Sequence, residues 1–333
     1  MSHKKNLISS ICILRLSSIG DITHMIPIIK TIQYYLPKSD ITWIIGKTEY
    51  PLVKNMKGVN FILIDKSKNI RSIINLWHEI KSKKFDIFLH MQKSLRSKII
   101  GFFIKYKRKL NYSNIQIPKN SHVLDSFFCF LKEIGIDKRV LDWSIEIDSS
   151  DKDIINIKKK YIVLNPFTSV RRFNYREWEI QNYATVAKYI FDKYNIETIV
   201  IGGPSQYEIK KSKQMVSQSY IHNIVGKTNL HQMCCVINNC QFYIGPDSGT
   251  MHIASMLNKP VIGLFATSNS KRTGPYHSQD YIIDKYDEAL KIFLNKSENQ
   301  ISWGKRIRNK KAMSLITTDE VCSKIDELMK KNN

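Results

Sequence analysis

The sequence predicts an α/β protein made of two domains, each built on a parallel β-sheet. Three observations lead to this prediction. The 333 residues exceed what one hydrophobic core usually organises. Short apolar runs rich in β-branched residues alternate with segments of helical period, which is typical of parallel strands joined by crossover helices. A polar, charged segment, IDSSDKDIINIKKK, interrupts this alternation near the middle of the chain.

In the first half, apolar runs predict strands at residues 11–16, 41–46, 59–65 and 85–91. Between them, apolar residues recur every three or four positions, which predicts helices over residues 22–36, 70–82 and 94–106.

The second half repeats the pattern. Strands are predicted at residues 161–167, 196–204, 221–226, 240–247 and 259–266, and helices at 179–194, 248–258 and 318–329. We therefore expect a first domain over residues 1–155 and a second over 156–315. We expect the C-terminal helix, residues 316–333, to pack back on the first domain.

The charge of the chain narrows its possible partners. It has 52 Lys and Arg residues against 29 Asp and Glu, a formal charge of +23, so we expect an anionic molecule or surface nearby. Nucleic acid, phosphorylated small molecules and acidic lipid head groups all satisfy this condition.

The six cysteines have neither the C-x-x-C spacing nor the Cys/His pairing of zinc sites. We therefore expect reduced, buried thiols and no structural metal. Arg15 interrupts the N-terminal apolar run, no signal-peptide cleavage site follows it, and no stretch approaches the ~18 apolar residues that span a bilayer. The sequence predicts a cytoplasmic protein, free or bound peripherally to a membrane.

The turn after the first predicted strand, LRLSSIGDITHMIP, contains the carboxylate of Asp21. Asp is a preferred helix N-cap, because its oxygen accepts an orphan backbone N–H. The same residue lies beyond the carboxyl end of a strand, where ligands bind in open parallel sheets. Both interpretations stand at this point.

A late turn, YIGPDSGTMHIA, joins a strand to a helix that carries His252. Free N–H groups at a helix start bind anions well, so Ser248 and the amides of Gly249 and Thr250 are candidates for holding a diphosphate. The alternative is a plain capped helix, since Asp and Ser both cap well.

Two further turns follow strands of the second half. LNPFTSVRRFNYREW offers hydroxyls from Thr168 and Ser169 and guanidinium groups from Arg171 and Arg172, which match phosphate; a solvated surface loop is the alternative. VIGGPSQYE places Gly203 in a tight turn.

Several catalytic motifs do not occur in the sequence. There is no G-x-G-x-x-G and no P-loop, which argues against nicotinamide enzymes and Walker-type ATPases. There is no G-x-S-x-G and no H-E-x-x-H, so hydrolysis by an activated serine or by zinc is not supported.

A basic segment extends from Lys81 to Asn120, with eleven Lys and Arg residues against one Asp. Lys93 and Arg96 would point across the mouth of a cleft; a solvated basic face is the alternative. Aromatic residues interleave only loosely and no nucleic-acid motif is present, so no nucleic acid is expected as a partner. An acidic membrane lipid explains the segment more economically.

Taken together and in this order, LRLSSIGDITHMIP, FTSVRRF…REW and GPDSGTMHIA…KPVIGLFATSN resemble glycosyltransferase family 9, the ADP-heptose heptosyltransferases of lipopolysaccharide core assembly. The resemblance spans nearly the whole chain. ITWIIGKTEY, HVLDSF and RTGPY are most similar to the OpsX-like branch of heptosyltransferase I. The resemblance implies a GT-B fold, in which two Rossmann-like domains with parallel sheets face an interdomain cleft, the first binding the acceptor and the second the nucleotide sugar.

The resemblance also implies roles for single residues. Asp21 matches the general base of an inverting transfer, and VGKTN is similar to the loop beside the adenosine. Acceptor contacts are expected from Lys93, Arg96 and His122. Donor contacts are expected from Ser18, Gly20, Thr168, Ser169, Arg171, Arg172, Gly203, Gly226, Lys227, Thr228, Asp247, Ser248, Gly249, Thr250 and His252.

The implied substrates are ADP-heptose and the phosphorylated Kdo of Kdo-lipid A, at the cytoplasmic face of a Gram-negative inner membrane. The implied enzyme is a monomer that needs no metal ion and no cofactor. Two alternatives stay open. One is a heptosyltransferase that adds a later heptose or uses another nucleotide sugar, and the other is a non-catalytic basic α/β protein that binds nucleic acid or anionic lipid.

Overall fold

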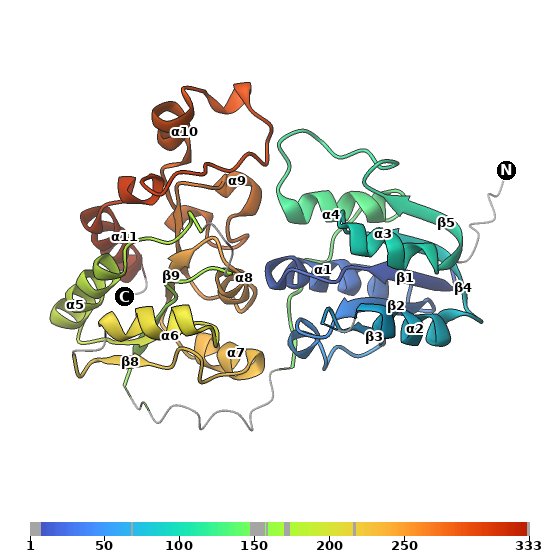
Figure 1. Ribbon diagram of the computed structural model, residues 1–333, viewed down its shortest axis with the longest axis horizontal. Helices are drawn as coiled ribbons and strands as arrows, with labels where there is room; N and C mark the ends of the chain where they lie inside the picture. The colour runs from blue at the N-terminus through green and yellow to red at the C-terminus, as the bar shows by residue number, and fades with distance from the viewer. Residues whose placement is uncertain are drawn as a thin grey trace. The chain divides into compact units, whose positions relative to one another are not determined.

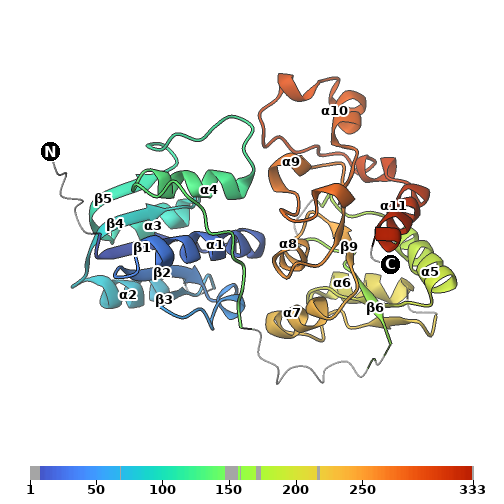
Figure 2. The same cartoon turned by 180° about the vertical axis from the view of Figure 1, so that it is seen from behind.

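The chain divides into two compact units, Met1–Glu146 and Ile147–Asn333. The computed structural model describes residues 8–67, 69–146, 157, 159–169, 174–215 and 218–331. Each unit is an α/β domain with one parallel sheet (Figure 1 and, from behind, Figure 2). The division after Glu146 precedes the predicted boundary at 155/156, which lies outside the described residues.

The sheet of the first unit has five parallel strands in the order β3-β2-β1-β4-β5. Their bounds are β1 (Ser10–Leu14), β2 (Asp40–Gly46), β3 (Val59–Ile64), β4 (Lys84–His90) and β5 (Lys105–Asn111). The helices are α1 (Ile19–Tyr35), α2 (Asn69–Ile80), α3 (Leu95–Phe102) and α4 (Val123–Lys132), with a short 3-10 helix, η1, at Tyr50–Leu52.

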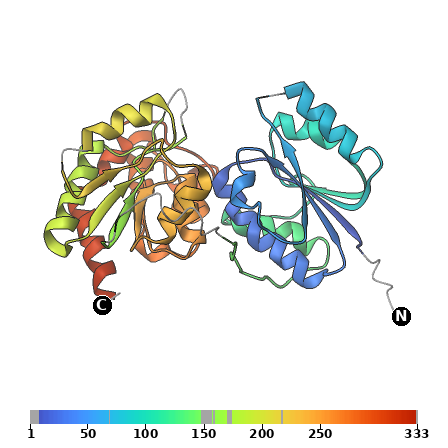
Figure 3. The same ribbon diagram turned by 90° about the horizontal axis from the view of Figure 1, so that it is seen from below.

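The helices cover both faces of this sheet. Helices α2 and α3 share one face, where Leu76, Ile80 and Ile100 join Phe88 in a buried cluster. Helices α1 and α4 contact each other and lie on the opposite face (Figure 3). Strands buried from both sides explain why their sequences read as continuous apolar runs.

The predicted helix over residues 94–106 is too long. Helix α3 ends at Phe102, and β5 begins at Lys105. The sequence of β5, KYKRKLN, is mostly exposed and cationic, and the strand lies at the edge of the described sheet, beside β4. Charged side chains are a common way to protect an edge strand from unwanted pairing. Because they replace apolar residues here, the apolar pattern of the sequence does not indicate this strand.

The sheet of the second unit has six parallel strands in the order β11-β10-β9-β6-β7-β8. They are β6 (Tyr161–Leu164), β7 (Glu197–Val200), β8 (Ile221–Asn223), β9 (Tyr243–Pro246), β10 (Val261–Phe265) and β11 (Ile283–Asp284). The α-helices are α5 (Ile180–Tyr194), α6 (Gln206–Ser212), α7 (Leu230–Asn238), α8 (Gly249–Met256), α9 (Ser270–Thr273), α10 (Tyr286–Leu294) and α11 (Thr318–Lys331), and the 3-10 helices are η3 (Lys213–Met215), η4 (Gln279–Tyr281), η5 (Glu298–Gln300) and η6 (Ala312–Leu315).

The sequence predicts that the C-terminal helix packs on the first domain, whereas its apolar residues are buried in the core of the second. Helix α11 contacts α5 and β10 of the second unit, and Val321, Ile325 and Leu328 are fully buried in that unit's core. On α5, the Tyr189 and Tyr194 hydroxyls each donate a hydrogen bond of 2.7 Å to Asp326. The apolar stripe of α11 predicts burial, but only the folded chain selects the core that receives it.

All six cysteines are free, and four of them are buried. Burial raises the pKa of the Cys234 and Cys240 thiols to about 12, which makes both groups unreactive near neutral pH. Over the part of the chain that the structure describes, no helix combines the length and apolar character needed to cross a membrane.

Gly46 provides a test of the packing between β2 and the turn after β1. A side chain at this position would overlap the carbonyl oxygen of Leu16 and a carboxylate oxygen of Glu49. We therefore expect Gly46→Ala to lower the free energy of unfolding by about 1–3 kcal/mol, measured by urea denaturation. Gly101→Ala is the matched control, because its new methyl group would meet His90 and Phe88 at an ordinary 3.5 Å. Equal effects of the two substitutions would contradict this interpretation.

Candidate functional site

Strand order points to one edge of each sheet. In the first unit the chain leaves β1 toward β2 but leaves β4 toward β5, so the loops after β1 and β4 separate in opposite directions. In the second unit the loops after β6 and β9 do the same. Open α/β sheets bind ligands at such switch points, beyond the carboxyl ends of the strands. Asp21 follows β1 and Asp247 follows β9, so both lie at a switch point.

Asp21 is the third residue of α1 and forms a capping box with Ser18. The backbone N–H and the hydroxyl of Ser18 each donate to Oδ2 of Asp21 at 3.0 Å, and the guanidinium of Arg15 forms an ion pair with the same oxygen. Among the described residues these contacts all converge on Oδ2, which leaves Oδ1 to accept a proton from a bound hydroxyl. The capping role is therefore real, and it is compatible with the catalytic one.

Arg15 keeps this carboxylate ionised. Its guanidinium donates to the carbonyl oxygen of Met91 and lies 5.1 Å from the centre of the Phe127 ring, so the side chain is held in place. Burial raises the pKa of Asp21, but the charge of Arg15 and the two hydrogen bonds from Ser18 lower the pKa more. The net pKa of Asp21 therefore lies below its ordinary value.

Gln92 ties the two loops of the first switch point together. Its side-chain oxygen accepts a 2.6 Å hydrogen bond from the backbone N–H of Leu16. Its side-chain amide donates to the hydroxyls of Ser17 at 3.4 Å and Ser94 at 3.3 Å. Neither Gln92 nor the pairing role of Arg15 was predicted from the sequence.

The three predicted acceptor contacts all belong to loops or helix starts at this same edge. Lys93 places its ammonium group 4.5 Å from the centre of the Tyr112 ring, and Arg96 is a half-buried residue of the first turn of α3. His122 caps α4 by accepting a 3.1 Å hydrogen bond from the N–H of Leu124. Its ring lies 5.4 Å from that of His24 on α1, the helix that carries Asp21.

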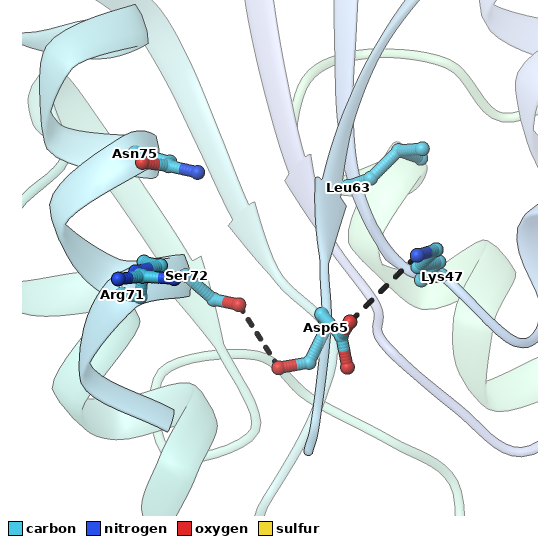
Figure 4. A pocket seen from close by; sticks show the side chains of 6 residues that line it. All are labelled: Lys47, Leu63, Asp65, Arg71, Ser72 and Asn75. Atoms are coloured by element: carbon cyan, nitrogen blue, oxygen red, sulfur yellow. Dashed lines mark hydrogen bonds and ion pairs between the residues drawn. The ribbon is translucent and has the colours of Figure 1, made fainter. Parts of the chain in front are cut away.

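The first unit also contains a pocket that the sequence did not predict (Figure 4). Its volume is about 200 Å³, and it lies between the carboxyl ends of β2 and β3 and the first turns of α2. Lys47 is 3.8 Å from Asp65, whose carbonyl accepts a 2.9 Å hydrogen bond from Ser72. The lining residues are Lys47, Leu63, Asp65, Arg71, Ser72 and Asn75. Two cations against one carboxylate suit an anionic group.

The second switch point is organised by a hydrogen-bonded cluster around α8. Asn165, after β6, donates to the hydroxyls of Thr250 at 2.5 Å and Ser248 at 3.4 Å. The buried Tyr243 hydroxyl lies 2.8 Å from that of Thr250, and Ser248 caps the helix by accepting from Met251. These contacts hold the loop so that the backbone N–H groups of Gly249 and Thr250, which have no acceptor within the helix, are fixed in place.

Asp247 is buried and compensated by Arg176. A guanidinium nitrogen of Arg176 donates to the backbone oxygen of Asp247 at 2.7 Å and lies 3.7 Å from its carboxylate. Another guanidinium nitrogen of Arg176 donates to Ser169 at 3.4 Å, while His252 lies 4.0 Å from the carboxylate. The arginine that connects these predicted residues is therefore Arg176.

The loop after β6 contributes Thr168, whose hydroxyl donates to Asn174 at 2.8 Å and whose N–H donates to Glu177 at 3.2 Å. The predicted contacts Arg171 and Arg172 lie outside the described residues. Arg176 belongs to the REW triplet of the same turn, so an arginine at this place is visible in the sequence.

The remaining predicted donor contacts lie in the loops after β7 and β8. The N–H of Gly203 donates to the carboxylate of Glu208, and burial raises the pKa of that carboxyl despite this bond. Gly226 adopts a positive φ of 75°, and its N–H donates to Gly202 at 3.2 Å. Thr228 keeps its hydroxyl buried beside the exposed Lys227.

Two Rossmann-like units with a polar switch point in each define a GT-B glycosyltransferase architecture. The comparisons with known proteins agree. Residues 73–300 match the model of glycosyltransferase family 9 (heptosyltransferase), and the chain belongs to this family. It is an enzyme, so the alternative of a non-catalytic binding protein is wrong.

The similar proteins cover almost the whole chain. The lipopolysaccharide core heptosyltransferase OpsX of Haemophilus influenzae is 32% identical over 96% of both chains. A family 9 glycosyltransferase structure from Veillonella parvula has a TM-score of 0.79 at 20% identity and covers 99% of both chains. The E. coli heptosyltransferase WaaC with ADP has a TM-score of 0.72 at 14% identity, covering 96% of this chain and all of the other. The two structures support the fold, and the first relative supports the OpsX-like resemblance.

The role of Arg15 can be tested by titration. We expect Arg15→Gln to raise the pKa of the Asp21 carboxyl, because burial then opposes only the two Ser18 hydrogen bonds. Carbon-13 NMR of the carboxyl groups measures this, with Asp21→Asn identifying the signal. Arg108→Gln, which removes the distant ion pair with Glu133, should leave the pKa unchanged.

The same pairing has a consequence for stability. Because the pKa of Asp21 is lower in the folded protein, its carboxylate stabilises the fold when the pH is above 3.8, the ordinary pKa of the group. This contribution is lost as the pH falls through the pKa of the folded state. An Asp21 pKa that does not move in Arg15→Gln would show that the ion pair does not control the charge.

Proposed function

We propose that this enzyme transfers heptose from ADP-L-glycero-D-manno-heptose to the phosphorylated Kdo of Kdo-lipid A, in lipopolysaccharide core synthesis, with inversion and without a metal ion. The observation that carries the proposal is the Asp21 carboxylate, held ionised by Arg15 at the first switch point. The 32% identity to OpsX, a lipopolysaccharide core heptosyltransferase, supports the choice of substrates.

In the proposed reaction, Oδ1 of Asp21 accepts the proton of a Kdo hydroxyl. The hydroxyl oxygen forms a bond to the anomeric carbon of the heptose, and the bond from that carbon to the diphosphate breaks on the opposite face, releasing ADP. A carboxylate of low pKa is a weak base, so the proton moves late, as the new bond makes the hydroxyl acidic. One base and one displacement give inversion.

The second switch point supplies stabilisation for the leaving diphosphate. The N–H groups of Gly249 and Thr250 start α8, where the helix dipole favours negative charge. Arg176 neutralises Asp247, so that carboxylate does not repel an incoming phosphate. Donors fixed before the reaction cost no reorganisation as charge develops, and this is why we propose that no metal ion is required.

The acceptor is proposed to bind at the carboxyl edge of the first sheet. Lys93 and Arg96 would meet the carboxylate and phosphate of Kdo, with His122 beside them. The pocket between Lys47 and Arg71 is a second place for an anionic group of the acceptor. We further propose that the enzyme works as a monomer on the cytoplasmic side of the inner membrane and binds that membrane peripherally.

The function is tested with purified protein, ADP-heptose and Kdo-lipid A, by following ADP release and the mass of the lipid product. We expect one added heptose per acceptor, with unchanged rates in EDTA. Parallel reactions contain UDP- and GDP-sugars, or an acceptor that already carries the first heptose. Transfer only to the heptose-bearing acceptor, or only from another nucleotide sugar, would replace the proposed substrates.

Asp21→Asn tests the base. We expect it to bind ADP-heptose like the wild type and to slow transfer by about 10²–10⁴-fold, because the amide cannot accept the proton. Exposed Asp137 on the first unit provides the control Asp137→Asn, which should keep full activity. Near-normal turnover of a folded Asp21→Asn protein would remove Asp21 from the mechanism.

A further inference from the structure

Helix α3 exposes an apolar stripe on the surface of the first unit. Leu95 is 74% exposed and Phe102 is 87% exposed, and Ile99 lies between them and is also exposed. The spacing of four and three residues places all three on one side of the helix. The opposite side, with Ser97, Ile100 and Gly101, is buried. The helix therefore has a second apolar face that the core does not use.

Helix α2 also exposes apolar residues. Ile74 and Trp77 are exposed and one turn apart, while Leu76 and Ile80 of the same helix are buried with Ile100 in the core. The two helices cover the same face of the sheet (Figure 3). Lys105, just after α3, donates a 2.9 Å hydrogen bond to the carbonyl of Lys81, just after α2. We name Ile74, Trp77, Leu95, Ile99 and Phe102 the α2–α3 face.

Exposed cations lie on α3 and just after the ends of α2 and α3. They are Lys81, Lys83, Lys84, Lys98 and Lys105. The acids nearby do not cancel them. Asp86 is paired with Lys107 at 2.6 Å, and Glu79 lies about 140° around α2 from Ile74, away from the apolar stripe.

We propose that the α2–α3 face docks on an anionic lipid bilayer. The inference rests on the proposed function in one respect, that the acceptor is a lipid, and it assigns the surface that meets the membrane. Apolar side chains flanked by Lys enter the boundary between head groups and acyl chains, and the cations meet the phosphates. Trp77 suits this boundary, where aromatic rings gather. A protein partner would need acidic residues at positions that match these cations, whereas an anionic bilayer presents phosphate groups in every orientation.

Cosedimentation with vesicles tests the proposal. We expect the full-length protein to bind vesicles containing phosphatidylglycerol, to bind phosphatidylcholine vesicles weakly, and to be partly released by salt. The triple variant Leu95→Ser, Ile99→Ser, Phe102→Ser should lose about tenfold or more of this binding. Ile292→Ser, at an exposed apolar residue of α10, is the matched control and should bind normally.

A second readout separates docking from catalysis. With detergent-dispersed Kdo-lipid A and ADP-heptose, the triple variant should transfer heptose at the wild-type rate, since none of its three residues belongs to the candidate site. If the wild type binds vesicles but shows no transfer, the docking face stands and the proposed function fails. Vesicle binding by the triple variant equal to the wild type would overturn the docking face, as would a wild-type dimer that becomes a monomer in the triple variant.

Discussion

The ion pair between Arg15 and Asp21 is the contact on which the charge at the first switch point depends. A carboxylate at the start of α1 is favoured by the helix dipole and by the N–H of Ser18, whereas burial raises its pKa. Arg15 opposes this rise together with Ser18, and it is itself held by Met91, just after β4, and by Phe127 on α4, both far away in sequence. The charge of a residue in the first loop therefore depends on the assembly of the whole sheet.

The second unit contains a comparable pair of a carboxylate and an arginine, but the arginine comes from a different element. Asp247 also follows a central strand and is also compensated by an arginine, but Arg176 comes from the loop after β6 and not from the same strand. In the first unit the arginine keeps a carboxylate charged and contacts only one of its two oxygens. In the second it neutralises a buried carboxylate, so that the amides at the start of α8 present a positive end. Two similar pairs at two switch points thus suit the two roles that we propose, a base in the first unit and an anion site in the second.

The cations of the basic segment lie in two separate places on the first unit. Lys93 and Arg96 lie at the edge that carries Asp21, whereas Lys98 and Lys105 flank the apolar stripe of α3. A residue's position on α3 decides which role is open to it, because residues two positions apart on a helix point to different sides. One basic segment can therefore contact an anionic substrate and an anionic surface.

The sequence by itself determined the α/β class, nearly all the strands and the turns that carry Asp21, Thr168 and Asp247. These are local signals: apolar runs, helical period and the residues of strand-to-helix turns. Strand β5 was not predicted, because its exposed, cationic side chains form no apolar run. The sequence also did not indicate the contacts of Arg176 and Gln92 or the pocket beside Lys47.

Only the tertiary structure decided these contacts and the pocket, and it also decided that the apolar face of α11 is buried in the second core. An apolar stripe indicates that one face of a helix is buried, but it does not indicate which core buries that face. Likewise, a charged side chain shows its partner only when strands distant in sequence bring the two together. Periodicity encodes each element's own faces, whereas ion pairs, loop ties and helix docking depend on distances across the assembled sheet.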